Sequence, residues 1–363
     1  MANDLERYLV EKAVAMGSPI KATLELSPLC NLNCAMCYIR HSQREVCEAG
    51  GLLSASWWES LIPELQEMGV LFVTLIGGEP FLYPDLERLY RKLAESGFYL
   101  NLTTNATLLA NGVPDWLRQS PPRYISVSLY GADDKTYELV TGDPAGFTKT
   151  MAGLENLLGA GIPVRLNYIA LPENVESVDR IFAIRDKYDL PLIATGYCFP
   201  QARREQKNGY RRLTPQEAAK AELRMRALRE PDRVKDMMAY LAADSFSQET
   251  SRHTDKIYCH AGSSTFWISW RGEMLPCGMM KEPVVSVRPG FLQEAWNEIR
   301  RWTGEVRTAP ECASCSRREI CKVCPAIQQA ETGFFDQCPE YLCSMTGKMV
   351  RLAAERVTGD AGH

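Results

Sequence analysis

Three cysteines near the amino end have the spacing C-x3-C-x2-C, within the string LCNLNCAMCY. A 4Fe–4S cubane takes one cysteine per iron, so Cys30, Cys34 and Cys37 would hold three irons and leave the fourth free to bind another molecule. A structural metal site is normally closed, whereas a reactive one needs an open position. The alternatives are a zinc site or a redox pair, but structural zinc prefers four ligands and His41 is the one histidine nearby. The spacing therefore favours a reactive cluster.

The remaining cysteines are numerous and clustered. The chain of 363 residues has 13 cysteines beside four histidines, and six of the cysteines fall between positions 312 and 343. In a reducing compartment this pattern indicates metal ligation or redox chemistry instead of disulfides. The first residues carry neither the basic nor the apolar segment of a secretion signal. We therefore expect a cytoplasmic protein.

Composition and charge exclude several classes of protein. Apolar residues make up 45% and charged residues 24%, as in soluble proteins with a buried core. Lys and Arg total 41 against 45 for Asp and Glu, a net charge of −4, which argues against a dedicated nucleic-acid or anionic-membrane binder. No apolar run is long enough to span a membrane. We expect neither nucleic acid nor a membrane as a partner.

Six short apolar runs, separated by helical patterns, must position the first three cysteines. The runs cover residues 21–26, 71–76, 99–103, 124–129, 164–170 and 190–195. Strands that alternate with helices of this length predict parallel βα units. Six units are too few for a full eight-unit barrel. The predicted fold is therefore α/β, a partial (β/α)6 barrel similar to a TIM barrel, with its active site at the carboxyl ends of the strands.

The rest of the chain is predicted to divide around this barrel. Thr214, Pro215 and Glu217 form a good helix start, so a helical bridge is expected after the barrel. A small cysteine-rich domain that depends on metal for its order follows. The predicted parts are an N-terminal segment 1–20, the barrel 21–205, the bridge 206–256, the cysteine-rich domain 257–351 and a tail 352–363.

The motifs beside the predicted strands resemble those of the radical SAM superfamily, in which the three-cysteine motif builds a 4Fe–4S cluster that binds S-adenosylmethionine. Gly77, Gly78 and Glu79, in GGEP, match the element that holds the methionine ammonium, although GGEP could also be an ordinary turn. Glycines allow close approach of the backbone, and a carboxylate complements a cation. Asn105 in TTNATLL and Ser128 in SVSLYG resemble two further cofactor-binding positions.

Some residues depart from the family pattern or fit it loosely. Met36 stands where the family usually has an aromatic residue, and Tyr130 stands where an acid is common. Cys198 follows the last predicted strand, near the face where barrel active sites gather. Tyr130 and Cys198 are the candidate catalytic residues. Arg165 is either a partner for a cofactor carboxylate or a solvated surface residue.

The later cysteines begin with the spacing C-x12-G-x4-C at Cys259, Gly272 and Cys277. The following C-x2-C-x5-C run fits neither a zinc ribbon, which needs about 15–20 residues between its cysteine pairs, nor the ferredoxin run. The order resembles the SPASM extension of radical SAM enzymes, from Cys259 to about Arg351. That extension carries two auxiliary 4Fe–4S clusters and usually has three residues before its sixth cysteine, where this chain has two.

The resemblance implies a ligand set for each auxiliary cluster. One would be held by Cys259, Cys277 and Cys324, and the other by Cys312, Cys315, Cys321 and Cys343. Cys338 is surplus and either closes the first of these clusters or leaves it with an open iron. Cys47 and Cys198 fit no cluster. The implied cofactors are three 4Fe–4S clusters, one of which binds S-adenosylmethionine.

The resemblance also implies an activity. Radical SAM enzymes generate a 5′-deoxyadenosyl radical that abstracts hydrogen, and those with this extension mostly modify peptides or proteins. We expect an oxidative maturase that forms a thioether or carbon–carbon crosslink in a ribosomally made peptide, reduced by a flavodoxin or ferredoxin. About twenty residues precede the barrel, so a separate leader-binding protein is a further expected partner. The basic run Arg203, Arg204, Lys207, Arg211 and Arg212 is either a solvated loop or a steering surface for an acidic leader.

Two alternatives stay open. Anaerobic sulfatase maturases, which oxidise Cys or Ser to formylglycine, resemble this chain in size. They carry an Asp after the cysteine that matches Cys277, where this chain has Gly278. The other alternative is a non-catalytic iron–sulfur electron carrier, which would not need the motifs at the strand ends.

Overall fold

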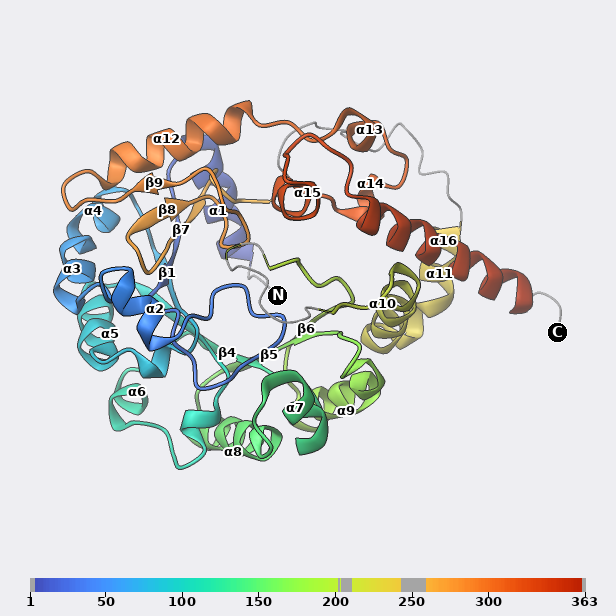
Figure 1. Ribbon diagram of the computed structural model, residues 1–363, viewed down its shortest axis with the longest axis horizontal. Helices are drawn as coiled ribbons and strands as arrows, with labels where there is room; N and C mark the ends of the chain where they lie inside the picture. Colours follow the sequence, from blue (N-terminus) through green and yellow to red (C-terminus); the bar gives the residue numbers. More distant parts are fainter. Residues whose placement is uncertain (1–3, 202, 204–210, 243–258, 361–363) are drawn as a thin grey trace.

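The computed structural model describes residues 4–201, 203, 211–242 and 259–360, and one curved sheet runs through it (Figure 1). Six parallel strands lie in the spatial order β6-β5-β4-β3-β2-β1. They are β1 (Lys21–Glu25), β2 (Phe72–Ile76), β3 (Tyr99–Thr104), β4 (Tyr124–Ser128), β5 (Val164–Ile169) and β6 (Leu192–Thr195). Each strand coincides with a predicted run to within two residues at either end. The predicted α/β fold with a parallel sheet is confirmed.

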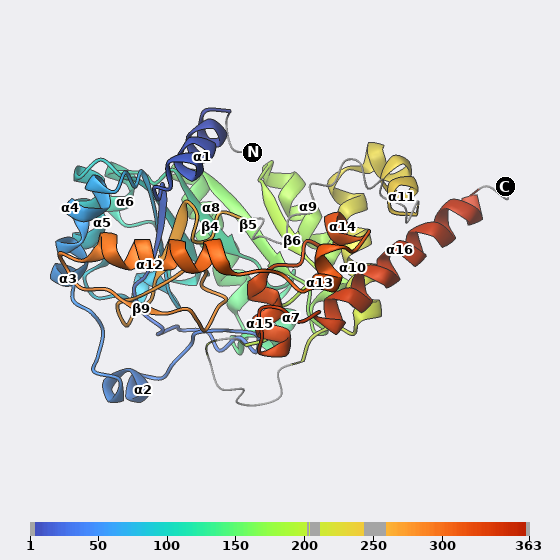
Figure 2. The same ribbon diagram turned by 90° about the horizontal axis from the view of Figure 1, so that it is seen from above.

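Helices cover the outer face of these strands (Figure 1). α5 buries Leu86, Leu89, Tyr90 and Leu93, the apolar stripe that faces the sheet. The segment 54–69 forms two short helices, α3 and α4, because Pro63 has no N–H to continue a single helix. The helices of this layer are α3 (Ala55–Ser60), α4 (Ile62–Glu67), α5 (Leu86–Glu95), α6 (Asp115–Gln119), α7 (Asp134–Thr141), α8 (Gly146–Gly159) and α9 (Val178–Tyr188), with 3-10 turns η1 (Pro80–Leu82), η2 (Thr107–Leu109) and η3 (Val175–Ser177). α2 (Gln43–Glu48) projects away from the sheet on the segment that follows the motif cysteines (Figure 2).

The cysteine-rich region extends the same sheet. β7 (Thr265–Ile268) pairs in parallel with β1, and β8 (Glu273–Leu275) and β9 (Val285–Ser286) add antiparallel to it. α12 (Leu292–Glu305) covers these strands with Trp296, whose indole N–H donates to the carbonyl of Gly17 at 3.1 Å. The sequence predicted a small region ordered by metal. Main-chain pairing with β1 gives the region a further source of order.

A helical layer stands beside β6 (Figure 2). α10 (Pro215–Arg229) begins at the predicted capping box, in which Thr214 and Glu217 each cap the other's backbone amide. α10 and α11 (Val234–Ala242) both pack against α16 (Glu340–Asp360), which continues through much of the predicted tail. Parts of the predicted bridge, residues 206–210 and 243–256, lie outside the described residues. The other elements are α1 (Asp4–Met16), η4 (Pro231–Arg233), α13 (Pro310–Ala313), α14 (Arg318–Cys321) and α15 (Pro325–Thr332).

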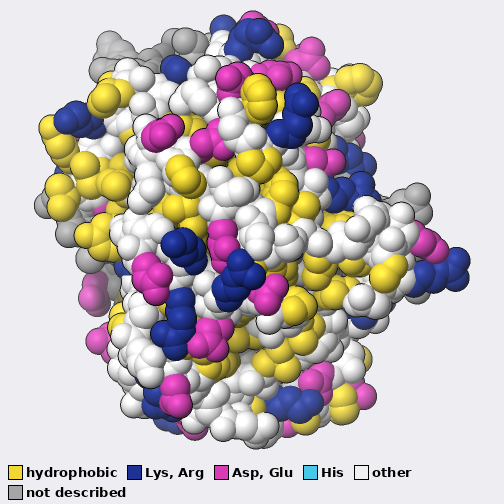
Figure 3. Space-filling model, turned by 90° about the vertical axis from the view of Figure 1, so that its left-hand side faces the viewer, with side chains coloured by type: hydrophobic (Ala, Val, Ile, Leu, Met, Phe, Trp, Pro, Cys, Tyr) yellow, Lys and Arg dark blue, Asp and Glu magenta, His cyan; other side chains and the backbone are white. Residues whose placement is uncertain are grey.

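Charges of both signs are mixed on the face of the molecule that Figure 3 shows. On the helical layer, Arg88 of α5 pairs with Glu59 of α3 at 2.8 Å. The described part of this face therefore has no large patch of positive charge of the kind that attracts nucleic acid. None of the helices in the described ranges has the length and apolarity to cross a membrane.

Candidate cofactor site and cysteine groups

The loop that carries the first three cysteines is held against the end of β2. The amide of Gly78 donates to the carbonyl of Ser27 at 2.7 Å, and the amide of Glu79 donates to that of Leu29 at 2.8 Å. A Cβ atom on Gly78 would lie 2.4 Å from the Leu29 oxygen, and one on Gly77 would lie 2.4 Å from the Ser27 oxygen. Both glycines are therefore required by the close approach of the cysteine loop itself.

A cavity of about 370 Å³ lies at the carboxyl ends of the barrel strands. Its volume is in the range of small-molecule sites. All three motif cysteines line it, together with four of the five predicted cofactor-binding residues. These seven residues are Cys30, Cys34, Cys37, Gly77, Gly78, Asn105 and Ser128. We call this space the cofactor cavity.

Two of the three motif thiols, those of Cys30 and Cys34, are largely withdrawn from solvent, and their protonated forms are favoured. Burial raises the pKa of Cys30 to about 11 and raises the pKa of Cys34 well above its usual value, and the neighbouring Cys37 adds to both shifts. The amide of Leu32 donates to Cys30 Sγ at 3.4 Å, and the amide of Arg40 donates to Cys37 Sγ at 3.3 Å. Such thiols lose their protons when metal binds, and N–H donors stabilise the resulting thiolates. The residues present therefore fit an iron–sulfur cluster.

Glu79 lies behind the wall of the cofactor cavity. Its side chain is fully buried, and Oε1 accepts from the Thr104 hydroxyl at 2.8 Å and the Phe81 amide at 3.2 Å. Oε2 accepts from the amide of Asn105 at 2.9 Å. Burial raises the pKa of Glu79 to about 7, although the three hydrogen bonds act to lower it. The carboxylate thus joins the end of β2 to the end of β3, and its contact with the cofactor ammonium stays a prediction.

Asn105 directs its side chain at the cysteine loop. Nδ2 lies 3.7 Å from Cys30 Sγ and donates to Asn31 Oδ1 at 3.0 Å, while Oδ1 accepts from the amide of Thr107 at 2.9 Å. Three hydrogen-bonding groups thus fix one amide at the end of β3. Ser128 occupies the matching position at the end of β4 and lines the same cavity.

The two candidate catalytic residues both reach the cofactor cavity, and Arg165 does not. Tyr130 and Cys198 line it, and Cys198 packs with Met36 in a small apolar cluster. Burial raises the pKa of Tyr130 well above its usual value, so the phenol stays protonated at neutral pH. Arg165 instead stacks on the ring of Tyr124, 4.1 Å from its centre, near the start of β5. Its predicted role toward a cofactor carboxylate has no support from this position.

A buried ion pair that the sequence analysis missed lies between the cysteine motif and the C-terminal region. The Glu25 carboxylate, fully buried, accepts from both terminal nitrogens of Arg203 and from the indole N–H of Trp267 at 2.9 Å. The guanidinium lies 5.2 Å from the ring centre of Tyr38, the residue after Cys37. The signal was present in the sequence as one acidic residue within the apolar run of β1.

The three described members of the basic run are engaged within the chain, and a steering role for the run stays a prediction. Besides Arg203, Arg211 pairs with Glu173 at 3.1 Å, and Arg212 pairs with Glu331 at 2.5 Å. The other two members, Arg204 and Lys207, lie outside the described residues. Every described cation of the run is paired with a carboxylate of this chain.

Three of the C-terminal cysteines form a first auxiliary group, Cys259, Cys277 and Cys324. Burial raises the pKa of Cys324 to about 12, and the thiols of Cys259 and Cys277 contribute to that shift. Burial and Cys259 also raise the pKa of Cys277, while the cation of Arg203 opposes them. The structure thus brings together the three residues that the resemblance assigned to one auxiliary cluster.

The other five C-terminal cysteines form a second auxiliary group around a cavity of about 140 Å³. They are Cys312, Cys315, Cys321, Cys338 and Cys343. Burial raises the pKa of Cys312 and of Cys343, and in both cases the thiol of Cys338 adds to the effect. The predicted closure of the first group by Cys338 has no support from this position, because the thiol lies among the second group. The other predicted alternative, a first group of three cysteines with an open iron, stays a prediction.

The thiol spacing differs from that of a single-ion site. In the described part of the chain, no three Cys, His, Asp or Glu side chains are arranged to hold one metal ion. A cubane does not require such an arrangement, because it spreads its cysteines over separate irons.

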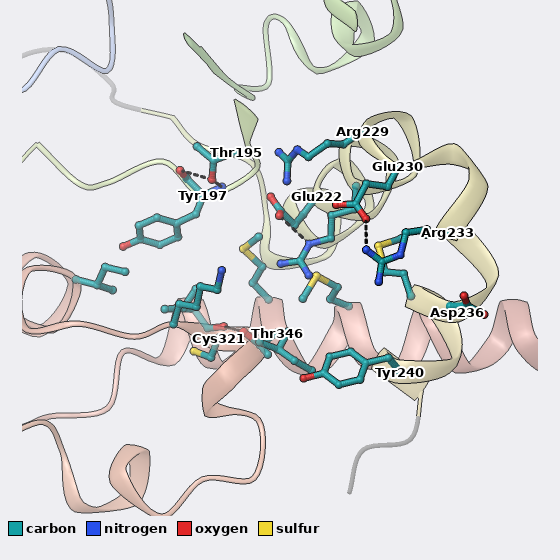
Figure 4. Close-up of a pocket in the computed structure, with 18 residues that line it drawn as sticks. Thr195, Tyr197, Glu222, Arg229, Glu230, Arg233, Asp236, Tyr240, Cys321 and Thr346 are labelled. Atoms are coloured by element: carbon teal, nitrogen blue, oxygen red, sulfur yellow. Dashed lines mark hydrogen bonds and ion pairs between the residues drawn. The ribbon is translucent and has the colours of Figure 1, made fainter. Parts of the chain in front are cut away.

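A larger cavity of about 760 Å³ adjoins the cofactor cavity and opens between the end of β6, α10, α11 and α16 (Figure 4). Thr195 and Tyr197 line both spaces, and Cys321 of the second auxiliary group lies in the wall of the larger one. We call this space the side cavity. Its charged side chains are Glu222, Arg226, Arg229, Glu230, Arg233, Asp236 and Lys322.

Several known proteins are similar to this chain. It is 25% identical to the AdoMet-dependent heme synthase of Methanosarcina barkeri over 92% of this chain and 98% of that protein. It is 26% identical to the PqqA peptide cyclase of Granulibacter bethesdensis over 83% of this chain and 81% of the cyclase. Its fold is similar to that of Streptococcus suis SuiB bound to S-adenosylmethionine, with a TM-score of 0.64 and 19% identity over 94% of this chain and 81% of SuiB. SuiB bound to its precursor peptide SuiA gives a TM-score of 0.63.

The match to a protein family covers the strands and loops that form the cofactor cavity. Residues 24–183 match the Radical SAM superfamily. This range contains the three motif cysteines, the GGE element, Asn105 and Ser128, which the fold brings to one edge of the sheet. Members of the family use a 4Fe–4S cluster and S-adenosylmethionine, for which the cavity has a fitting donor set. Residues 24–183 therefore form a radical SAM domain.

Proposed function

We propose that this enzyme acts on a peptide or protein and forms a thioether or carbon–carbon crosslink in it. The observation that carries the proposal is the side cavity, which shares Thr195 and Tyr197 with the cofactor cavity and has about twice its volume. A segment of peptide held there would reach the cofactor past these two residues. The similarity to a PqqA peptide cyclase and to peptide-bound SuiB supports a substrate of this class.

In this proposal Cys30, Cys34 and Cys37 hold the cluster, and Gly77, Gly78, Asn105 and Ser128 line the space for S-adenosylmethionine. When bound, these groups supply a 5′-deoxyadenosyl radical that takes a hydrogen atom from a substrate carbon. The chain's own contribution is to exclude water and to orient the substrate. Apolar side chains dominate the cavity wall, among them Leu32, Met36, Ile39, Ile76, Ile169 and Phe199.

The proposed reaction is oxidative. A crosslink removes two hydrogen atoms from the substrate: one leaves with the radical, and the other leaves as a proton and an electron. Cys321 lies in the wall of the side cavity, so a cluster on the second auxiliary group would stand beside the substrate and accept that electron. A flavodoxin or ferredoxin as reductant, and a separate leader-binding protein, belong to the same proposal.

Formylglycine formation receives less support at the position after Cys277. A Cβ atom on Gly278 would lie 2.7 Å from the ring of Trp267, so an acidic side chain would displace that ring. Trp267 is fixed by its hydrogen bond to the buried carboxylate of Glu25.

A second candidate is a heme-forming reaction. The similarity to the Methanosarcina barkeri heme synthase extends over 98% of that protein. The side cavity would then hold a carboxylated tetrapyrrole, with Arg229 and Lys322 as partners for its carboxylates.

The deciding experiment uses the anaerobically reconstituted enzyme with S-adenosylmethionine and dithionite. It is incubated with short peptides encoded beside its gene or with an iron tetrapyrrole, and 5′-deoxyadenosine and substrate mass are measured. We expect a peptide to lose two hydrogen atoms with matching 5′-deoxyadenosine. The matched control replaces Cys30, Cys34 and Cys37 by Ala and should form neither product.

If the enzyme converted the tetrapyrrole and none of the peptides, the crosslinking proposal would be wrong and the heme-forming reaction would take its place. A peptide that gains an aldehyde instead of a crosslink would support formylglycine formation. No 5′-deoxyadenosine with any substrate would favour an electron carrier.

A further inference from the structure

The second auxiliary group has one thiol more than a cubane needs. A 4Fe–4S cluster takes one cysteine on each of its four irons. The cavity of about 140 Å³ is lined by five cysteine side chains, together with the buried guanidinium of Arg318. One of the five must therefore be spare when the cluster is complete.

The spare thiol is one of a pair at the start of α16. Cys338 lies just before this helix and Cys343 in its first turn, where the amide of Cys343 donates to the carbonyl of Pro339 at 3.0 Å. The side chain of Cys338 lies within hydrogen-bonding reach of both Cys343 and Cys312. Cys338 and Cys343 thus line the same cavity from positions five residues apart on one short segment.

The first auxiliary group, in contrast, has one thiol too few. All 13 cysteines of the chain are described, and ten belong to the motif, to the first group or to the other members of the second group. Of the remaining three, Cys338 lies in the second group, Cys198 lines the cofactor cavity, and Cys47 is exposed on α2. No cysteine is left to complete Cys259, Cys277 and Cys324.

We propose that Cys338 and Cys343 are interchangeable ligands of one iron in the second auxiliary cluster, and that the first auxiliary cluster has three cysteines and an iron open to an outside ligand. The inference rests on the proposed function and on the two auxiliary clusters that the family resemblance implies. Exchange needs no oxidant or reductant: the incoming thiol gives up its proton, and the outgoing thiolate takes one. The open iron would accept a small sulfur, nitrogen or oxygen donor.

A buried cation, Arg318, beside the second auxiliary group favours a cluster with four thiolates there. Its side chain is 2% exposed and borders the same cavity. A cubane with four thiolates is negatively charged, and a buried guanidinium compensates that charge.

The test counts how many auxiliary clusters accept cyanide. Full-length protein in which Cys30, Cys34 and Cys37 are replaced by Ala is reconstituted anaerobically and should carry about eight irons, four per auxiliary cluster. The dithionite-reduced clusters are then observed by electron paramagnetic resonance before and after addition of cyanide. We expect one cluster signal to shift in this background.

Variants on the same background separate the ligand assignments. Cys338→Ala and Cys343→Ala should each leave one shifting signal, because the remaining thiol completes the second cluster. The double variant should give two shifting signals. Cys47→Ala, a cysteine outside every group, is the matched control and should behave as the background does.

Two outcomes would overturn the proposal. If the background shows no shifting signal and Cys338→Ala shows one, Cys338 closes the first cluster. If Cys343→Ala alone gives two shifting signals, Cys343 is the sole fourth ligand and the pair is not interchangeable. Neither result depends on substrate, so the proposed crosslinking activity is tested separately from this inference.

Discussion

Arg203 and Glu25 form a buried ion pair across 178 residues of sequence. The pair ties the end of β1 to the segment after β6, and the same carboxylate accepts from Trp267 of β7. It lies between the loop of the three motif cysteines and Cys277 of the first auxiliary group. The pair therefore fixes the spacing of two predicted cluster sites.

Removal of the cation alone should be costly. Arg203→Met leaves the Glu25 carboxylate buried without its partner, so we expect the free energy of unfolding to fall by about 3–5 kcal/mol. The double variant Glu25→Leu/Arg203→Met removes both charges and should be more stable than Arg203→Met. Thermal unfolding of the metal-free protein measures both.

The matched control for this pair is Arg44→Met, whose partner Glu48 is 59% exposed. Loss of such a surface pair should change the stability by less than about 0.5 kcal/mol. If Arg203→Met were no more destabilising than Arg44→Met, the ion pair would not hold the two segments together.

Gly78 is required by the cysteine loop, so Gly78→Ala should disturb the cluster. The added methyl group would meet the carbonyl oxygen of Leu29 at 2.4 Å and push the loop away from β2. We expect loss of about four of the irons bound after anaerobic reconstitution, as one cubane would contain. Gly159→Ala, which meets no atom within 4 Å, is the control and should keep full iron content. Equal iron in both variants would contradict the requirement.

Glu79 should make the stability of the metal-free protein depend on pH. Its pKa rises from 4.5 to about 7 on folding because burial disfavours the charged form. The folded state therefore holds the proton more tightly, and this contribution is present below pH 4.5 and is lost as the pH rises through 7. The shift corresponds to about 3 kcal/mol.

Unfolding by urea at pH 5 and pH 8 checks this dependence. The loss of stability between the two values should be smaller in Glu79→Gln than in the wild type, whereas Glu48→Gln should leave it unchanged. An identical loss in wild type and Glu79→Gln would show that another group titrates.

We expect Cys198 to be a packing residue in the wall of the cofactor cavity and not a catalytic one. Its side chain is 3% exposed and packs with Met36, Val140 and Leu171. We expect Cys198→Ala to keep the cluster and to form 5′-deoxyadenosine at a rate within about fivefold of the wild type, since a packing change of this size costs less than about 1 kcal/mol. Radical formation with no crosslinked product would instead assign Cys198 a catalytic role. Tyr130→Phe, which keeps the ring and removes the hydroxyl, tests the other candidate in the same assay.

The strands and the cofactor cavity could be predicted because their signals are local. An apolar run with a turn after it specifies a parallel strand, and the carboxyl ends of parallel strands meet at one edge. Gly77, Asn105 and Ser128 follow three such runs, so their approach to Cys30 was expected from order alone. The three motif cysteines lie within eight residues, and their spacing limits them to one site.

Contacts between distant segments had no such local signal. The pairing of β7 with β1, the ion pair of Glu25 with Arg203, and the place of Cys338 all depend on how long connections return to the sheet. A cysteine fourteen residues after Cys324 can reach either auxiliary group, because the intervening chain can close in either direction at similar entropic cost. Spacing in the sequence therefore predicted that these thiols bind clusters, and only the packing of α15 and α16 decided which thiols stand together.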